Sequence, residues 1–220
     1  MPMKLAVFDC DGTLVDSQAN ILRAMHSSFS RLGLDDPDPH AVRRVVGLSL
    51  VEAMQALLPD APADLHERLA EDYKLAFQRL RADQMLDPEP LFDGVRELLE
   101  ELDAGGWQLA VATGKSDRGL KLCLEHHGLE KHFISLQTAD RHPSKPHPSM
   151  LLQCIADAGV APEAAFIIGD TVFDIGMGVA SGVTALGVDW GYHEAAELME
   201  AGAAAVARDA GELKALLHGQ

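Results

Sequence analysis

The stretch Lys4-Leu-Ala-Val-Phe-Asp-Cys-Asp-Gly-Thr13 decides the fold. A continuous apolar run that stops at a glycine turn is typical of a strand buried on both faces, as in a parallel sheet. Open parallel sheets bind their ligands at the carboxyl ends of the strands. The stretch therefore predicts a buried strand over residues 4–8, with Asp9 and Asp11 at the edge of the sheet where ligands bind.

Similar apolar runs recur along the chain, at residues 107–112, 165–168 and 183–188. Helical patterns lie between them, at 95–102, around 120–124 and at 148–158, and each is followed by a glycine that can end a helix. Strands that alternate with helices indicate βαβ units. We therefore expect an α/β fold with a Rossmann-like parallel sheet.

One segment interrupts this alternation. From residue 17 to 86 no run reads as a strand, whereas Ile21, Met25 and Phe29 fall on one helical face. Pro/Asp-rich turns separate the helical patterns, and Asp87-Pro-Glu-Pro90 precedes the return to the α/β pattern. The sequence thus predicts a core of residues 1–16 and 87–220 and an inserted all-α unit of residues 17–86. A helical decoration at the edge of the core is the alternative.

The composition excludes several classes of partner. The 220 residues contain 18 Lys+Arg against 34 Asp+Glu, a net charge of −16, and so negative a protein repels nucleic acid and anionic membranes. The three cysteines form no CxxC pair, and no apolar stretch has the length of a signal-peptide core or a membrane span. We expect a cytoplasmic protein that binds neither nucleic acid nor membrane; the sequence carries no signal for an oligomeric state.

Two acidic motifs follow strand-like runs. Asp9 and Asp11 end the first run, and Asp170 ends another in Gly169-Asp-Thr-Val-Phe-Asp174. Four carboxylates at neighbouring strand ends repel one another unless a cation lies between them, and Mg²⁺ suits a site with few carboxylates, phosphate and water. Each motif alone could instead cap a helix. An EF-hand is excluded, because Gly12 directly follows the second aspartate.

A hydroxyl and a lysine complete the set of candidates. Thr113 ends the run over residues 107–112, and the free backbone amides after it suit a phosphate oxygen. The following Gly-Lys-Ser is not a P-loop, because Leu109 stands where that motif requires glycine. Lys145 lies in the proline-rich turn Pro143-Ser-Lys-Pro-His-Pro148, which would hold it as a fixed cation; taken alone, it could instead be a solvated loop lysine.

The order of these motifs resembles the haloacid dehalogenase-like hydrolase superfamily, and within it the phosphoglycolate phosphatase-like branch. Residues 17–86 resemble the small helical cap of that branch, and the resemblance spans the whole chain. Many relatives carry asparagine directly after the motif threonine, where this chain has Gly114.

The resemblance implies a phosphatase that hydrolyses a small phosphorylated metabolite, such as phosphoglycolate or a sugar phosphate, through an aspartyl-phosphate. Asp9 would be the nucleophile and Asp11 the general acid and base. Mg²⁺ would be held by the Asp9 carboxylate, the Asp11 carbonyl oxygen and Asp170, and Asp174 would either ligate the metal or orient a water. The phosphate would be bound by Asp11, Gly12, Thr113, Gly114 and Lys145. In the cap, Arg43, Arg44 and Gly47 would contact the leaving group. The alternative is that Arg43 and Arg44 are solvated residues of a cap helix.

The same motifs also bear on three other functions. A phosphomutase would use the same core and a similar cap. A phosphorelay receiver also places acidic residues, a hydroxyl and a lysine at strand ends, but its phosphoacceptor follows a later strand and no helical insert follows its first one. A dehalogenase lacks the second aspartate that stands here as Asp11.

Overall fold

The computed structural model describes residues 3–219 and contains a six-stranded sheet in which every pairing is parallel. The strands are β1 (Leu5–Phe8), β2 (Gln108–Thr113), β3 (Phe133–Thr138), β4 (Ala165–Gly169), β5 (Thr184–Val188) and β6 (Ala205–Ala207). Their order is β3-β2-β1-β4-β5-β6, which is the doubly wound order of Rossmann-type folds. The predicted α/β fold is therefore confirmed. Met1, Pro2 and Gln220, at the ends of the predicted core, lie outside the described residues.

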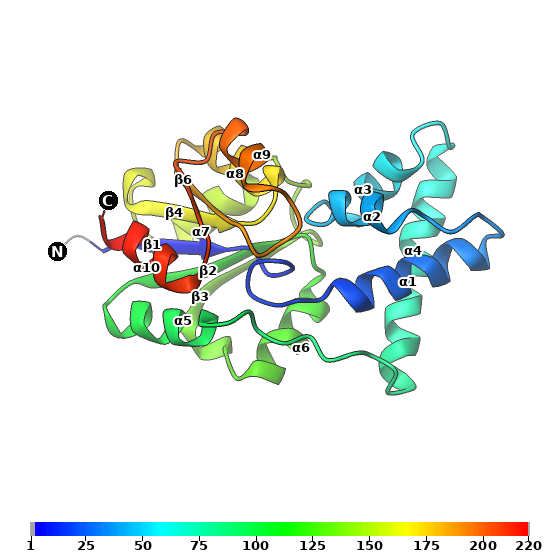
Figure 1. The fold of residues 1–220 in the computed structure, drawn as a ribbon, viewed down its shortest axis with the longest axis horizontal. Helices are drawn as coiled ribbons and strands as arrows, with labels where there is room; N and C mark the ends of the chain where they lie inside the picture. The colour runs from blue at the N-terminus through cyan, green and yellow to red at the C-terminus, as the bar shows by residue number, and fades with distance from the viewer. Residues whose placement is uncertain (1–2, 220) are drawn as a thin grey trace.

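Helices cover both faces of the sheet (Figure 1). The core helices are α5 (Val95–Ala104), α6 (Asp117–His127), α7 (Ser149–Ala158), α8 (Val172–Ser181), α9 (Ala195–Glu200) and α10 (Ala210–Gly219). In β1, Ala6 and Phe8 join the apolar cluster on one face, and Leu5 and Val7 join the cluster on the other. Since strand side chains alternate between faces, a strand covered on both sides has to be apolar throughout.

Four further helices follow β1 as one insertion and form a separate apolar cluster around Met54, Leu69 and Phe29. We call them the cap: α1 (Gln18–Arg31), α2 (Pro39–Val45), α3 (Leu50–Leu57) and α4 (Ala63–Ala82). The two chain segments that join the cap to the core meet in an antiparallel bridge between Val15 and Leu91. The boundaries 17–86 stay a prediction, but the helical insertion itself is present.

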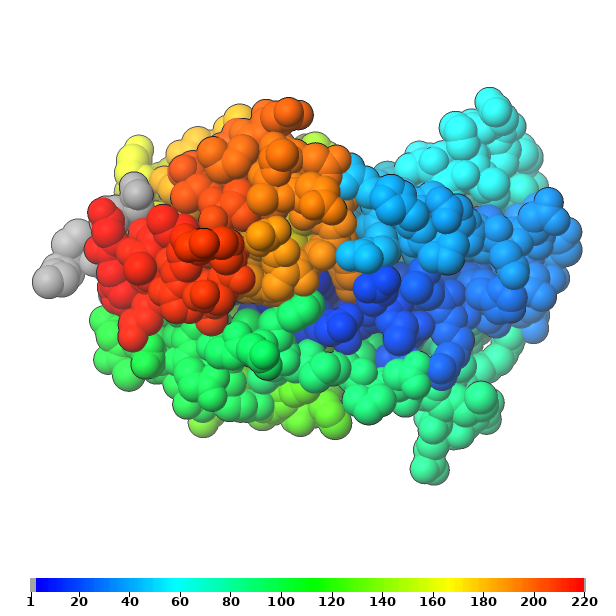
Figure 2. Space-filling model, in the orientation of Figure 1, coloured from blue at the N-terminus to red at the C-terminus, as the bar shows by residue number. Residues whose placement is uncertain are grey.

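The cap lies beyond the carboxyl ends of the strands (Figure 1). In the space-filling view the blue segments of the cap touch the orange segments of the core (Figure 2). A bidentate ion pair lies at this contact, where Arg44 donates to both carboxylate oxygens of Glu197 over 2.6 and 2.7 Å. The cap therefore covers the sheet edge at which the acidic motifs end. Within residues 3–219, no helix has the length and apolar character that spanning a bilayer demands.

Candidate active site

The structure brings the carboxylates of Asp9, Asp170 and Asp174 together at the ends of the adjacent strands β1 and β4. One oxygen of each lies within 4.8 Å of the others, and all three residues are fully buried. Asp174 is in the first turn of α8, where it also forms a capping box with Thr171. Capping and clustering thus occur together, and the capping alternative does not exclude a metal site.

Lys145 is the cation of this cluster. Its Nζ donates to Asp9 Oδ1 over 2.9 Å and to Asp174 Oδ1 over 2.6 Å, and its side chain is completely buried. Burial alone would lower the pKa of Lys145, but the charges of Asp174 and Asp9 outweigh this effect and raise it. Lys145 is therefore a fixed, permanently charged partner, as the proline-rich turn predicts, and not a solvated loop lysine.

One lysine does not balance three carboxylates. Burial raises the pKa of Asp9 to about 7, although Lys145 opposes the shift, and burial also raises that of Asp170. Both oxygens of Asp170 are occupied, because Thr13 Oγ1 donates to one over 2.7 Å and the backbone N–H of Tyr192 donates to the other over 2.9 Å. Asp9 Oδ2 is buried and has no hydrogen-bond partner.

These observations fit a divalent cation. Buried charged oxygens without a partner are costly, and hard cations such as Mg²⁺ bind carboxylate oxygens. Asp9, Asp170 and Asp174 are the residues that would hold it. The carboxylate of Asp11 is not part of this group; only its backbone carbonyl stays a candidate ligand.

The Asp11 carboxylate faces the cavity between core and cap. Lys115 Nζ and Ser17 Oγ both donate to its Oδ1, the lysine over 2.5 Å. Burial alone would lower the pKa of Lys115, but Asp11 and other nearby groups raise it well above its usual value. Lys115 is not among the predicted site residues, because the Gly-Lys-Ser segment suggests a P-loop and fails as one. The sequence pattern that could have identified Lys115 is a lysine two residues after Thr113, the hydroxyl residue at the end of β2.

Gly12 is the position where the acidic motif demands glycine. Its φ is +84°, and a Cβ there would lie 2.2 Å from Asp170 Oδ2. The chain can therefore turn tightly after Asp11 and leave its backbone next to the carboxylate cluster. Thr113 is buried and lines the same cavity as Asp9 and Asp11. The predicted phosphate-binding groups thus gather at one edge of the sheet.

The predicted cap residues divide into two groups. Gly47 lines the cavity, whereas Arg43 and Arg44 do not. Arg44 pairs with Glu197, and Arg43 donates to the carbonyl of Gly191 over 3.4 Å and lies above the Tyr192 ring. The two arginines therefore join the cap to the core in this structure and give no support to a role in reading the leaving group.

Gly114 lies at a close contact between the cap and the core. A Cβ on Gly114 would be 2.8 Å from the carbonyl oxygens of both Gly47 and Leu48. Its φ does not require glycine, so the constraint comes from the cap alone. This explains why a side chain such as asparagine would not fit here without a change in how the cap closes.

We expect Gly114→Ala to impair cap closure without removing the backbone N–H at this position. Overpacking costs about 1–3 kcal/mol, so kcat/KM should fall about tenfold to a hundredfold if closure is needed for turnover. Steady-state kinetics and thermal unfolding measure the two effects separately. Gly211→Ala, in α10 away from the cap, is the control and should leave kcat/KM unchanged. An unaltered kcat/KM in Gly114→Ala would show that this contact does not matter for turnover.

Comparisons with known proteins agree with this architecture. Residues 6–188 match the family of haloacid dehalogenase-like hydrolases. The chain is 35% identical over 201 residues to "Probable phosphatase IndB" of Dickeya dadantii, which covers 90% of this chain and 86% of that protein. It is 33% identical over 202 residues to the phosphoglycolate phosphatase of Chromobacterium violaceum, covering 89% of each. The crystal structure of a hydrolase from Pseudomonas syringae superposes with a TM-score of 0.86 at 25% identity and covers 99% of both chains.

The family match begins in β1, includes both acidic motifs and the whole helical insertion, and ends at the last residue of β5. Both curated relatives exceed 30% identity over most of their length. The fold and the buried aspartate cluster agree with this family match. This protein belongs to the haloacid dehalogenase-like hydrolases.

Proposed function

We propose that this protein is a Mg²⁺-dependent phosphatase that hydrolyses a small-molecule phosphate monoester through an aspartyl-phosphate on Asp9. The observation that carries the proposal is the buried cluster of three carboxylates with one lysine and an unpartnered Asp9 oxygen. Both curated relatives described above are phosphatases by name. Membership of this family leaves no support for the receiver interpretation.

In the first step, a carboxylate oxygen of Asp9 attacks phosphorus, and the bond between phosphorus and the ester oxygen breaks. Asp11, which faces the cavity, would give a proton to the departing alkoxide. Lys145 contacts the nucleophile directly, so its charge would offset the repulsion between Asp9 and the phosphate. Thr113 and the backbone N–H group of Gly114 would receive the phosphoryl oxygens, whereas the backbone N–H of Gly12 donates to the carbonyl oxygen of Val15 over 3.0 Å.

In the second step, Asp11 would take a proton from water, and this water attacks phosphorus to release phosphate and restore Asp9. Lys115 and Ser17 hold one oxygen of Asp11 in place, which makes them positioning residues for both proton transfers. Mg²⁺, when bound by Asp9, Asp170 and Asp174, would supply positive charge that stabilises the phosphoryl oxygens.

Phosphate release should depend on the divalent cation. Metal stabilisation of the transition state is worth several kcal/mol, so chelation with EDTA should lower phosphate release from a panel of monoesters at least about a hundredfold. Readdition of Mg²⁺ should restore it. Equal phosphate release with and without chelator would contradict the proposal, and isomerisation of sugar phosphates without phosphate release would favour a phosphomutase.

The metal site can also be tested without turnover. A ligand that binds only the folded state stabilises it by about 2.7 kcal/mol at one hundred times its Kd. Mg²⁺ should therefore raise the Tm of the wild type, and Asp170→Asn should lose most of this increase. Asp60→Asn, at an exposed position in the cap, is the matched control and should keep it. A Tm increase that survives Asp170→Asn would place the cation elsewhere.

A further inference from the structure

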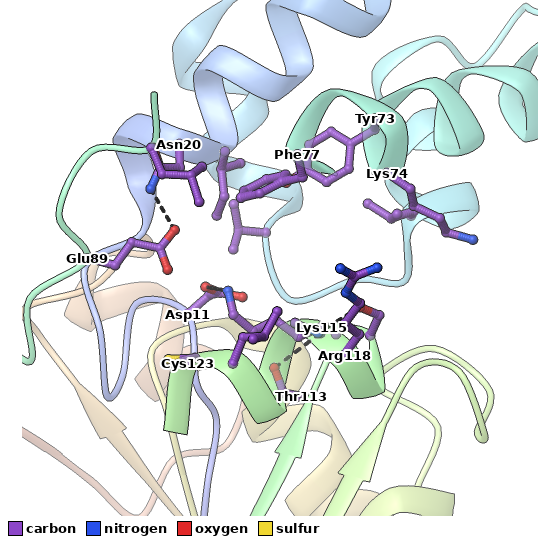
Figure 3. Close-up of a pocket in the computed structure, with 18 of the residues that line it drawn as sticks. Asp11, Asn20, Tyr73, Lys74, Phe77, Glu89, Thr113, Lys115, Arg118 and Cys123 are labelled. Atoms are coloured by element: carbon purple, nitrogen blue, oxygen red, sulfur yellow. Dashed lines mark hydrogen bonds and ion pairs between the residues drawn. The ribbon is translucent and has the colours of Figure 1, made fainter. Parts of the chain in front are cut away.

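A large cavity extends from the candidate nucleophile into the cap. It has a volume of about 1240 Å³ and reaches from Asp9 and Asp11 to Tyr73 and Phe77 of α4 (Figure 3). Ligand pockets usually measure about 300–1,000 Å³. A substrate whose alcohol is only two or three carbons long would therefore fill a small part of this space.

The cap contacts the core on one side of this cavity. The backbone N–H of Ser49 donates to Ser144 Oγ over 2.8 Å, and Arg44 pairs with Glu197. The carbonyl oxygens of Gly47 and Leu48 approach Gly114 so closely that a Cβ there would clash. The cap thus contacts the core on the side of α2 and α3, next to the cavity.

The cap side of the cavity is mainly apolar. The cap residues with apolar side chains that line it are Ile21, Met25, Val42, Val45, Val46, Leu48, Leu50, Ala53, Tyr73 and Phe77. Tyr73 and Phe77 lie one helical turn apart, and their ring centroids are 5.3 Å apart with the planes tilted by 55°. Both are only partly buried, although Leu69 and Ala76 of the same helix are fully buried. The two rings therefore present uncovered aromatic surface to the cavity.

The core side is polar and carries spare hydrogen-bond donors. Arg118, in the first turn of α6, lines the cavity and points towards it near Lys115 (Figure 3). Among the described residues, its guanidinium has no hydrogen-bond or ion-pair partner. A ligand that crosses from Asp9 to Phe77 would thus pass polar donors first and aromatic surface afterwards.

We propose that the leaving alcohol of the substrate carries a planar ring, and that this ring packs against Phe77 and Tyr73 while the phosphate lies at Asp9. The inference rests on the proposed phosphatase function and narrows its substrate class. Covering an aromatic side chain with a ring contributes apolar burial and a preferred tilted or offset geometry. Phosphoglycolate has no ring and would leave the aromatic pair uncovered.

The test compares kcat/KM for three alkyl monoesters with similar leaving groups: phosphoglycolate, naphthylmethyl phosphate with its ring one carbon from the ester oxygen, and a nucleoside monophosphate with its ring beyond a ribose. Burial of a large apolar group is worth about 1.5–3 kcal/mol, so at least one ring-bearing substrate should exceed phosphoglycolate by at least about tenfold. The two ring-bearing substrates differ in the distance between ring and phosphate, so the preferred one indicates where the ring lies. A preference for either one supports the proposal.

Phe77→Ala should remove most of this advantage and leave kcat/KM for phosphoglycolate within about twofold of the wild type. Phe77→Leu keeps apolar volume but has no flat face, so it shows whether a loss in Phe77→Ala comes from a folding defect. Leu75→Ala changes an apolar residue of the same helix that is 40% exposed and does not line the cavity, so all three substrates should be unaffected.

Two results would overturn the ring proposal while phosphatase activity stands. One is a kcat/KM for phosphoglycolate that equals or exceeds both ring-bearing substrates. The other is an equal loss for all three substrates in Phe77→Ala when Phe77→Leu and Leu75→Ala behave as the wild type. If no monoester releases phosphate, the proposed function itself fails, and the ring proposal falls with it.

Discussion

Asp9→Asn is expected to lower phosphate release by at least about 10⁴-fold, since loss of a nucleophile removes the covalent route altogether. The substitution keeps the size of the side chain and removes one negative charge from a site with three buried carboxylates. Phosphate release at saturating substrate, with Mg²⁺ present, measures the effect. Residual activity of more than about 1% of the wild type would contradict a nucleophilic role for Asp9.

The fold of this variant should survive, which separates a chemical defect from misfolding. Burial raises the pKa of Asp9 to about 7. A raised pKa means that the folded state favours the protonated carboxyl, so the metal-free protein loses stability as pH rises through about 7. Asparagine cannot ionise. At pH 8 in EDTA, Asp9→Asn should therefore unfold at a Tm equal to or above that of the wild type.

Asp11→Asn is the second substitution with a large expected effect. Asn cannot donate or accept the proton that both steps require, so turnover should fall by at least about 10²–10⁴-fold, the usual contribution of general acid–base catalysis. Asn can still accept hydrogen bonds from Lys115 and Ser17, so the local structure should persist. A normal steady-state rate would refute the assignment of Asp11.

The choice of leaving group separates the two roles of Asp11. Nitrophenolate needs no proton to depart, so with nitrophenyl phosphate only the second step should stall in Asp11→Asn. We expect a burst of one nitrophenolate per active site, followed by slow turnover. With an alkyl phosphate, whose leaving group needs a proton, the burst should be absent. Lys121→Met, an exposed lysine of α6 that does not line the cavity, is a control that should show neither change.

The interior of the sheet was predictable from the sequence, whereas its edges were not. β1, β2, β4 and β5 are inner strands covered on both faces, and each appears in the sequence as a continuous apolar run. The two edge strands, β3 and β6, were missed. Ser135 and Gln137 of β3 are buried polar residues, and Ser135 donates to Asp157 of α7. β6 has only three residues, Ala205–Ala207, and its small side chains give no strand pattern.

In the candidate site, too, the sequence predicts some of the residues but not all of their contacts. Asp9, Asp170 and Asp174 were predictable because their motifs follow apolar runs, and Lys145 because it lies in a proline-rich turn. The structure clusters the three aspartates and pairs Lys145 with Asp9 and Asp174. The contact of Lys115 with Asp11 was missed. The contact between Arg44 and Glu197 was missed too, because it joins two segments more than 150 residues apart and no local pattern encodes how the cap lies on the core. Tyr73 and Phe77 have the four-residue spacing of an ordinary apolar helix face, so only the structure shows that they line a cavity.

A phosphoryl group bound covalently to Asp9 can be detected directly by mass spectrometry of acid-quenched protein. Asp11→Asn is mixed with nitrophenyl phosphate and Mg²⁺, quenched during the slow phase and analysed as intact protein and as peptides. Most of the protein should gain the mass of one phosphoryl group, carried by the peptide that contains Asp9, and the Asp9→Asn,Asp11→Asn double variant should gain none. A full nitrophenolate burst with no phosphoryl group on the protein, or with the group on another residue, would contradict a covalent intermediate on Asp9.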